Sequence, residues 1–309
     1  MRWRPARQTQ VQDRRGGGLG GFGRGGLGGF GGGPRGGLGG GIPIPIGGGL
    51  GGIVLVVIIL LVVGFLGGGL GGPSGGLGGG GAGDPNATLD PDDEQAQFIN
   101  SVTVDIQTYW EEAFRAAGSD YPETELVLFS EATQTGCGAA SSATGPFYCP
   151  ADRLVYLDTT FFDELASRFG APGDFAQAYV IAHEFGHHVE NALGIMDRVR
   201  ADQQADPNRA NELSIRLELM ADCLAGVWAH SVWADPDQEN VESITEADIR
   251  EGLDAAAAVG DDRIQEQATG RIDRESWTHG SSEQRTAWFT TGFREGSMEA
   301  CDTFAVAQP

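Results

Sequence analysis

Glycine is concentrated at one end of this chain. Of its 51 glycines, 36 lie within the first 83 residues, mostly in Gly-Gly-Leu and Gly-Gly-Phe repeats. Such repeats have few side chains to bury and a large backbone entropy to lose, so they cannot pack a core. We therefore predict a disordered Gly/Arg-rich tail over residues 1–48, a Gly/Pro-rich linker over residues 72–91 and one folded domain over residues 92–309.

An uncharged apolar run interrupts the glycine repeats. Residues 53–66 contain one glycine and no charged residue, and the flanks from Gly47 to Gly72 are uncharged as well. Because a bilayer crossing needs about 20 apolar residues, the run and its flanks predict one transmembrane helix over residues 49–71. A cleaved signal peptide and a buried core strand are the alternatives. The long leader and the lack of a small-x-small cleavage site favour the membrane anchor.

Charge differs between the two parts of the chain. Residues 1–52 contain seven arginines and one acid, Asp13, whereas the remaining residues contain thirteen arginines and 42 acids. Positively charged flanks stay on the cytoplasmic side of a membrane. We therefore predict a single-pass protein of the cell membrane with a cytoplasmic N-terminus and an extracytoplasmic domain. The acidity of that domain argues against nucleic acid as a partner.

An HExxH motif lies inside an apolar, helix-forming run at residues 182–188, Ala-His-Glu-Phe-Gly-His-His. At 3.6 residues per turn, His183 and His187 share one face of a helix and can bind a single Zn²⁺, with Glu184 beside them as a general base. His188 points away from that face, so we interpret it as structural. A surface helix with a fortuitous motif is the alternative, but the apolar residues before the motif predict a buried helix.

A zinc site with an open position for water needs a third protein ligand. The extended pattern HExxHxxGxxH is absent, because Glu190 and Leu193 stand where it requires glycine and histidine. The segment 213–228 is apolar nearly all round, and Glu218 and Asp222 interrupt it four residues apart. Glu218 as the third ligand and Asp222 as the acceptor that orients a ligand imidazole would explain both interruptions. A structural network of these acids with arginines such as Arg216 or Arg250 is the alternative.

Three separated segments, HEFGHHVE, RLELMADCLAGVWAH and THGSSEQRTAWFTTGF, together resemble the bacterial membrane-anchored neutral zinc metallopeptidase family. The resemblance spans roughly residues 95–305, and the layout is also similar to gluzincins. It implies a zincin-like domain that hydrolyses peptide bonds with one Zn²⁺ per chain. By the same resemblance, His183, His187 and Glu218 are the ligands and Glu184 is the base.

His279 lies just before a predicted helix that Ser281 or Ser282 would cap. A histidine at this place can face a cleft and donate a hydrogen bond to the oxyanion of a tetrahedral intermediate. A packing or capping role is the alternative. Arg285 is a weaker candidate for the same function, and we interpret His230 as structural.

The four cysteines, Cys137, Cys149, Cys223 and Cys301, permit three pairings. An oxidising compartment favours two disulfides, and we expect Cys137 with Cys149 and Cys223 with Cys301. Four buried thiols are the alternative. Their spacings match no structural zinc site.

Periodicity and capping signals predict an α+β domain, dominated by helices and with a small sheet. The expected helices cover residues 92–117, 161–169, 173–192, 209–231, 245–259 and 282–304, and the expected strands cover residues 125–130 and 153–158. Leu154–Leu157 could form an exposed strand edge that pairs with an extended substrate, or it could be a core strand. Residues 197–211 are charged and poorly periodic, which favours a surface crossover.

These patterns favour a zinc-dependent peptidase that acts on a peptide or protein substrate. Two alternatives remain. One is a non-catalytic zinc-binding scaffold, in which His279 or His230 would supply a fourth ligand, and the other is a zinc hydrolase of a different bond.

Overall fold

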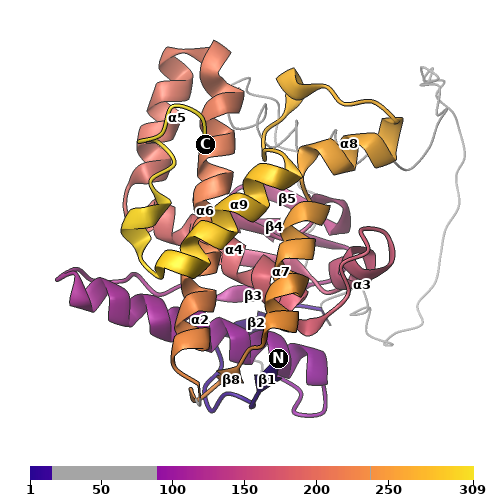
Figure 1. Ribbon diagram of the computed structural model, residues 1–309. Coiled ribbons are helices and arrows are strands. Elements are labelled where there is room, and N and C mark those ends of the chain that lie inside the picture. Colours follow the sequence, from indigo (N-terminus) through magenta and orange to yellow (C-terminus); the bar gives the residue numbers. More distant parts are fainter. Residues whose placement is uncertain (16–88, 237) are drawn as a thin grey trace, which may run out of the picture.

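The computed structural model describes residues 1–15, 89–236 and 238–309 and has an α+β architecture dominated by helices (Figure 1). The predicted α+β class, with many helices and a small sheet, is confirmed. The predicted transmembrane helix over residues 49–71 lies outside the described residues, as does most of the predicted linker. Within the described part of the chain, no helix is both long and apolar enough to cross a membrane.

The main sheet has four strands in the order β2, β3, β7, β6. β2 (Val11–Asp13) is parallel to β3 (Leu126–Phe129), β3 is parallel to β7 (Leu154–Asp158), and β6 (Phe147–Cys149) is antiparallel to β7. The two predicted strands are therefore confirmed as β3 and β7. Of the two alternatives for Leu154–Leu157, the core strand is confirmed and the exposed edge is wrong, because β7 lies between β3 and β6 and pairs on both sides.

Two smaller strand pairs flank this sheet. β1 (Arg2–Trp3) pairs antiparallel with β8 (Val241–Ser243), and β4 (Ala132–Thr135) forms a hairpin with β5 (Gly138–Ser141). Both predicted disulfides are present. Cys137–Cys149 joins the tip of the hairpin to β6, and Cys223–Cys301 joins two segments that are 78 residues apart.

The helices of the described residues are α2 (Glu94–Ala116), α3 (Thr160–Ser167), α4 (Asp174–Ala192), α5 (Ile195–Ala205), α6 (Ala210–Ala234), α7 (Glu246–Ala258), α8 (Asp261–Thr269) and α9 (Ser282–Glu295). Short 3-10 turns are η1 (Ser142–Thr144), η2 (Pro207–Arg209), η3 (Arg274–Ser276) and η4 (Met298–Cys301).

Each predicted helix has a counterpart, with two differences. α9 is shorter than the predicted 282–304, because Gly296 adopts a left-handed conformation with φ 61° and ends the helix. The predicted crossover over residues 197–211 is instead mostly helix, formed by α5 and η2. Ser281 caps α9 as expected, accepting a hydrogen bond from the Gln284 amide.

α6 is the central helix of the core and packs against both α4 and α9 (Figure 1). Glycines allow the backbones of α6 and α9 to approach each other closely. A Cβ atom on Gly226 would lie 2.1 Å from the Phe289 carbonyl oxygen, and one on Gly292 would lie 1.9 Å from the Cys223 carbonyl oxygen. Any larger side chain at these two positions would separate the helices.

The sheet has two apolar faces, because successive side chains point to opposite faces and every residue of β3 is apolar and buried. Leu126 and Leu128 of β3 join the main core with the helices, whereas Val127 and Phe129 pack with Tyr156 in a smaller cluster beside the Cys137–Cys149 disulfide. The sheet therefore supports α4 on one side and anchors the disulfide-bonded loop on the other.

Residues 1–15 belong to the folded domain, so the prediction of a disordered tail is wrong for this stretch. β2 forms one edge of the main sheet, and Val11 is only 3% exposed. The overall glycine content of the first 48 residues does not describe this stretch, because the glycines begin only at residue 16. The rest of the predicted tail lies outside the described residues.

Candidate metal centre

Two buried helices bring the HExxH motif and the acidic interruptions together. α4 carries His183, Glu184 and His187, and α6, which packs against it, carries Glu218. One ligand atom from each of His183, His187 and Glu218 lies within 4.8 Å of the others. The His183 Nε2 atom is 3.2 Å from one Glu218 carboxylate oxygen, and the His187 Nε2 atom is 3.5 Å from the other. The structure thus gathers the three predicted ligands at one point.

The far nitrogen of each imidazole is held by a carboxylate. The His183 Nδ1 atom lies 2.9 Å from Asp222 Oδ1, and the His187 Nδ1 atom lies 2.8 Å from Glu190 Oε2. Both acids are fully buried. A carboxylate at Nδ1 keeps the proton there and leaves the Nε2 lone pair available for a metal. Two such nitrogens and one carboxylate are a donor set that suits Zn²⁺.

The sequence pattern identified Asp222 but not Glu190 as a partner of a ligand. Glu190 lies three residues after His187 on the same helix, a spacing that places the two side chains on one face. That spacing is the sequence signal that could identify Glu190 as a partner of His187. Burial raises the pKa of Glu190 to about 7, partly offset by the neighbouring His187 imidazole.

Asp222 is the hub of a buried network. It accepts hydrogen bonds from Arg285 Nε at 2.8 Å, from Arg285 Nη2 at 2.9 Å and from the Tyr179 hydroxyl at 2.5 Å. Burial alone would raise the pKa of Asp222, but Arg285 and His183 outweigh it and keep the pKa below its ordinary value. Arg285 therefore supports a ligand imidazole through Asp222, whereas the sequence suggested that it faces the substrate.

Among the described residues, no arginine pairs with Glu218, whereas the alternative arginine network is present for Asp222, which pairs with Arg285. Arg216 pairs instead with Glu212 and donates to backbone carbonyls near the C-terminus, including Val306, and Arg250 pairs with Glu246. Glu218 contacts the two candidate ligand histidines.

Glu184 lies on α4 beside the two imidazoles and is 8% exposed. Burial raises its pKa, and the charges of His183 and His187 partly oppose this shift. A carboxylate with a raised pKa in a dry site can accept a proton near neutral pH and return it, as general-base chemistry requires.

The loop that carries His279 is hydrogen-bonded to Asp261. The amides of Thr278, His279 and Gly280 all donate to Asp261 Oδ2, and the His279 Nδ1 atom lies 3.2 Å from Asp261 Oδ1. Burial would lower the pKa of His279, but the carboxylates of Glu218 and Asp261 raise it. Asp261 was not identified from the sequence, and its position at the start of α8 gives no pattern that would reveal it.

The remaining histidines have structural partners. His188 lies between the Tyr148 hydroxyl and the Pro122 carbonyl, and burial lowers its pKa to about 4. The His230 Nδ1 atom donates to the Phe293 carbonyl at 2.7 Å. Across the described residues, no fourth His, Cys, Asp or Glu joins the three-residue cluster.

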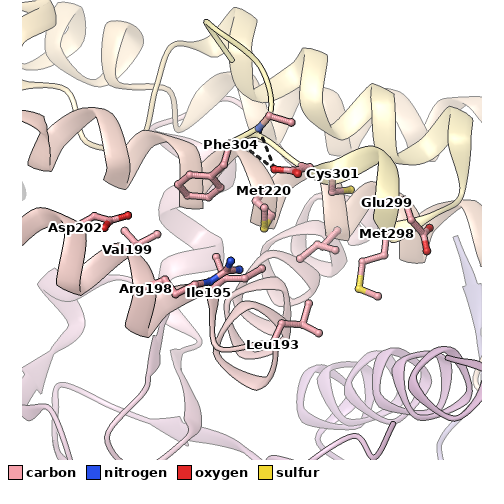
Figure 2. Close-up of a pocket in the computed structure, with 13 residues that line it drawn as sticks. Leu193, Ile195, Arg198, Val199, Asp202, Met220, Met298, Glu299, Cys301 and Phe304 are labelled. Carbon is pink, nitrogen blue, oxygen red and sulfur yellow. Dashed lines mark hydrogen bonds between the residues drawn. The ribbon is translucent and has the colours of Figure 1, made fainter. Parts of the chain in front are cut away.

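A cavity of about 660 Å³ lies near α5, α6 and η4, and Figure 2 shows Leu193, Ile195, Met220 and Phe304 among its lining residues. None of the candidate ligands lines this cavity. The candidate ligands lie instead where α4 packs against α6.

Comparison with known proteins gives one family. A family model described as "Putative neutral zinc metallopeptidase" matches residues 1–304. The uncharacterized protein YpfJ of Escherichia coli K12 is 47% identical over 214 residues, which cover 69% of this chain and 72% of that protein. The uncharacterized protein Rv2575 of Mycobacterium tuberculosis H37Rv is 48% identical over 192 residues, covering 60% of this chain and 64% of that protein. No solved structure matches.

Proposed function

Since the chain belongs to the neutral zinc metallopeptidase family, we propose that it is a zinc-dependent peptidase whose ligands are His183, His187 and Glu218. The observation that carries the proposal is the meeting of these three side chains, with each imidazole held at Nδ1 by a buried carboxylate. Bound zinc supplies a Lewis acid that makes water nucleophilic near neutral pH and polarises a carbonyl group.

Glu184 is the general base in this proposal. Its carboxylate takes a proton from the attacking water and then delivers it to the nitrogen of the leaving amine. The raised pKa of Glu184 suits both steps, because the acid must hold the proton between attack and departure.

His279 stabilises the negative charge that develops on the scissile carbonyl oxygen. Asp261 holds the Nδ1 side of the ring, so Nε2 is the atom that donates a hydrogen bond. The two neighbouring carboxylates raise the pKa of His279 and favour the protonated ring, in which both nitrogens carry hydrogen.

We further propose that the protein attaches to the cell membrane through residues 49–71, with its domain on the extracytoplasmic side. The apolar run at residues 53–66 supports attachment, and two disulfides support an oxidising compartment. The substrate is a peptide or protein.

Replacing Glu218 tests the ligand set. Glu218→Ala should weaken zinc binding by more than the roughly 10–100-fold that loss of an outer carboxylate causes, and casein hydrolysis should fall with it. The matched control is Glu212→Ala, which removes an acid of the same helix that pairs with Arg209 and Arg216. Competition with a chromogenic chelator measures the affinity. Equal zinc affinity in Glu218→Ala and the wild type would contradict the ligand assignment.

A further inference from the structure

Residues 11–13, near the N-terminus, form a strand of the domain's main sheet. Val11, Gln12 and Asp13 pair in parallel with residues 126–128. The hydrogen bonds continue on either side, from Leu126 N to Gln10 O and from Arg14 N to Leu128 O. Without this segment, β3 would be an unpaired edge.

Buried polar side chains of α2 form hydrogen bonds with the backbone of the same segment. Ser101 Oγ accepts from the Ala6 amide, and Asn100 accepts from the Gln10 amide while donating to the Gln8 carbonyl. Asn100 and Ser101 are 1% and 0% exposed. Removing the N-terminal segment would leave these polar groups without these partners, which is costly in an apolar setting.

The first residue reaches the helix that carries the HExxH motif. The Met1 amine lies 2.9 Å from an oxygen of Asp174, the first residue of α4, and 2.8 Å from an oxygen of Asp248 on α7. These contacts account for the acidic group formed by Asp174, Asp248 and Glu251, which otherwise resembles a cation site.

An ion pair joins the two described segments that precede and follow residues 16–88. The Arg15 guanidinium lies 2.7 Å from Asp93 Oδ2, at the residue that caps α2. The two described segments that border residues 16–88 therefore lie next to each other.

We infer that residues 1–15 and the domain lie on the same side of any membrane that the apolar run at residues 53–66 enters. A chain that starts and finishes on one side crosses an even number of times. Two crossings need about 40 apolar residues, and this run has fourteen. The docked N-terminus is therefore incompatible with the single crossing and the cytoplasmic N-terminus that the arginine count predicts. This inference does not depend on the zinc chemistry.

Cysteine labelling of the full chain in bacterial membranes tests the inference. Arg7→Cys reports on the N-terminal segment and Arg250→Cys on α7, and the two arginine side chains are 91% and 69% exposed. The four native cysteines are in disulfides and should not react. A membrane-impermeant maleimide should label both positions in the same preparation, either intact spheroplasts or inside-out vesicles. Labelling of the two positions in opposite preparations would overturn the inference.

A direct contact measurement supports the labelling. Arg2 and Ser243 are register partners in the antiparallel pair β1–β8. The double variant Arg2→Cys/Ser243→Cys should form an intramolecular disulfide in membranes treated with an oxidant, seen as a mobility shift on a non-reducing gel. Arg2→Cys alone is the control. A double variant that migrates like this control would contradict the docked N-terminus in the membrane.

Discussion

At the residue scale, the carboxylates that hold the two candidate ligand histidines differ in their hydrogen bonds. Asp222 holds His183 and accepts hydrogen bonds from Arg285 and Tyr179. Glu190 holds His187 and has one oxygen with no hydrogen-bond partner among the described residues. Asp222 could be predicted because an acid stands out in an apolar helix. The extended motif does not identify Glu190 as a partner of His187, because that motif has glycine at this position. The sequence does not identify Asp261 either, because its contacts come from a loop whose position the sequence does not predict.

A substitution of His279 can distinguish a catalytic role of this side chain from a role as a metal ligand. If its Nε2 atom stabilises the oxyanion, His279→Ala should lower kcat roughly 10²- to 10³-fold with zinc content unchanged. His230→Ala is the control, because that ring contacts the Phe293 carbonyl. Steady-state peptide hydrolysis and metal analysis on the same samples provide the measurement. Loss of zinc in His279→Ala would identify a fourth ligand and favour the scaffold alternative.

At the element scale, Asp105 joins three elements and should make stability depend on pH. Its carboxylate on α2 accepts from Trp228 Nε1 of α6 at 2.9 Å and from the Val241 amide of β8 at 3.1 Å. Burial raises its pKa from 3.8 to about 6, with the two hydrogen bonds opposing the shift. The folded state therefore binds the proton more tightly, so the stabilisation is complete below about pH 4 and lost as pH rises through about 6.

The difference between a pKa of 3.8 and one of about 6 corresponds to about 3 kcal/mol. The free energy of unfolding of the wild type, minus that of Asp105→Asn, should therefore fall by about 3 kcal/mol between pH 4 and pH 7. Denaturant titrations at several pH values measure this difference. Parallel curves for the two proteins would show that Asp105 does not titrate in this way.

The long apolar helices and the two predicted strands could be read from periodicity, because α4, α6 and β3 bury most of their residues. α5 and α8 could not. α5 has one buried residue, Val199, and α8 buries only Asp261 and Gln265, so neither has an apolar stripe. Their helical form depends on packing that the sequence does not display.

At the scale of the whole molecule, the two disulfides should differ in their contribution to stability. Cys223–Cys301 spans 78 residues and Cys137–Cys149 spans 12. Loop-closure entropy gives about 4.5 kcal/mol for the longer span and about 3 kcal/mol for the shorter one. Cys223→Ala/Cys301→Ala should therefore lower the free energy of unfolding more than Cys137→Ala/Cys149→Ala does. Denaturant titration checks this order, and the reverse order would contradict it.

The α+β class and both cysteine pairings followed from sequence, but the role of the first fifteen residues did not. β2 and β3 are separated by more than 100 residues of chain, and the pairing partner of a three-residue strand cannot be deduced from its own pattern. Experiments on this protein should accordingly use the full chain, because a fragment beginning near residue 90 would lack β1 and β2.

Metal content and casein hydrolysis of the full-length wild type and Glu184→Gln test the proposed function most directly. We expect one zinc per chain in both proteins and a loss of hydrolysis of roughly 10²- to 10⁴-fold in Glu184→Gln, because the substitution removes the base but none of the ligands. Full hydrolytic activity in Glu184→Gln, or a wild type without zinc, would contradict the account.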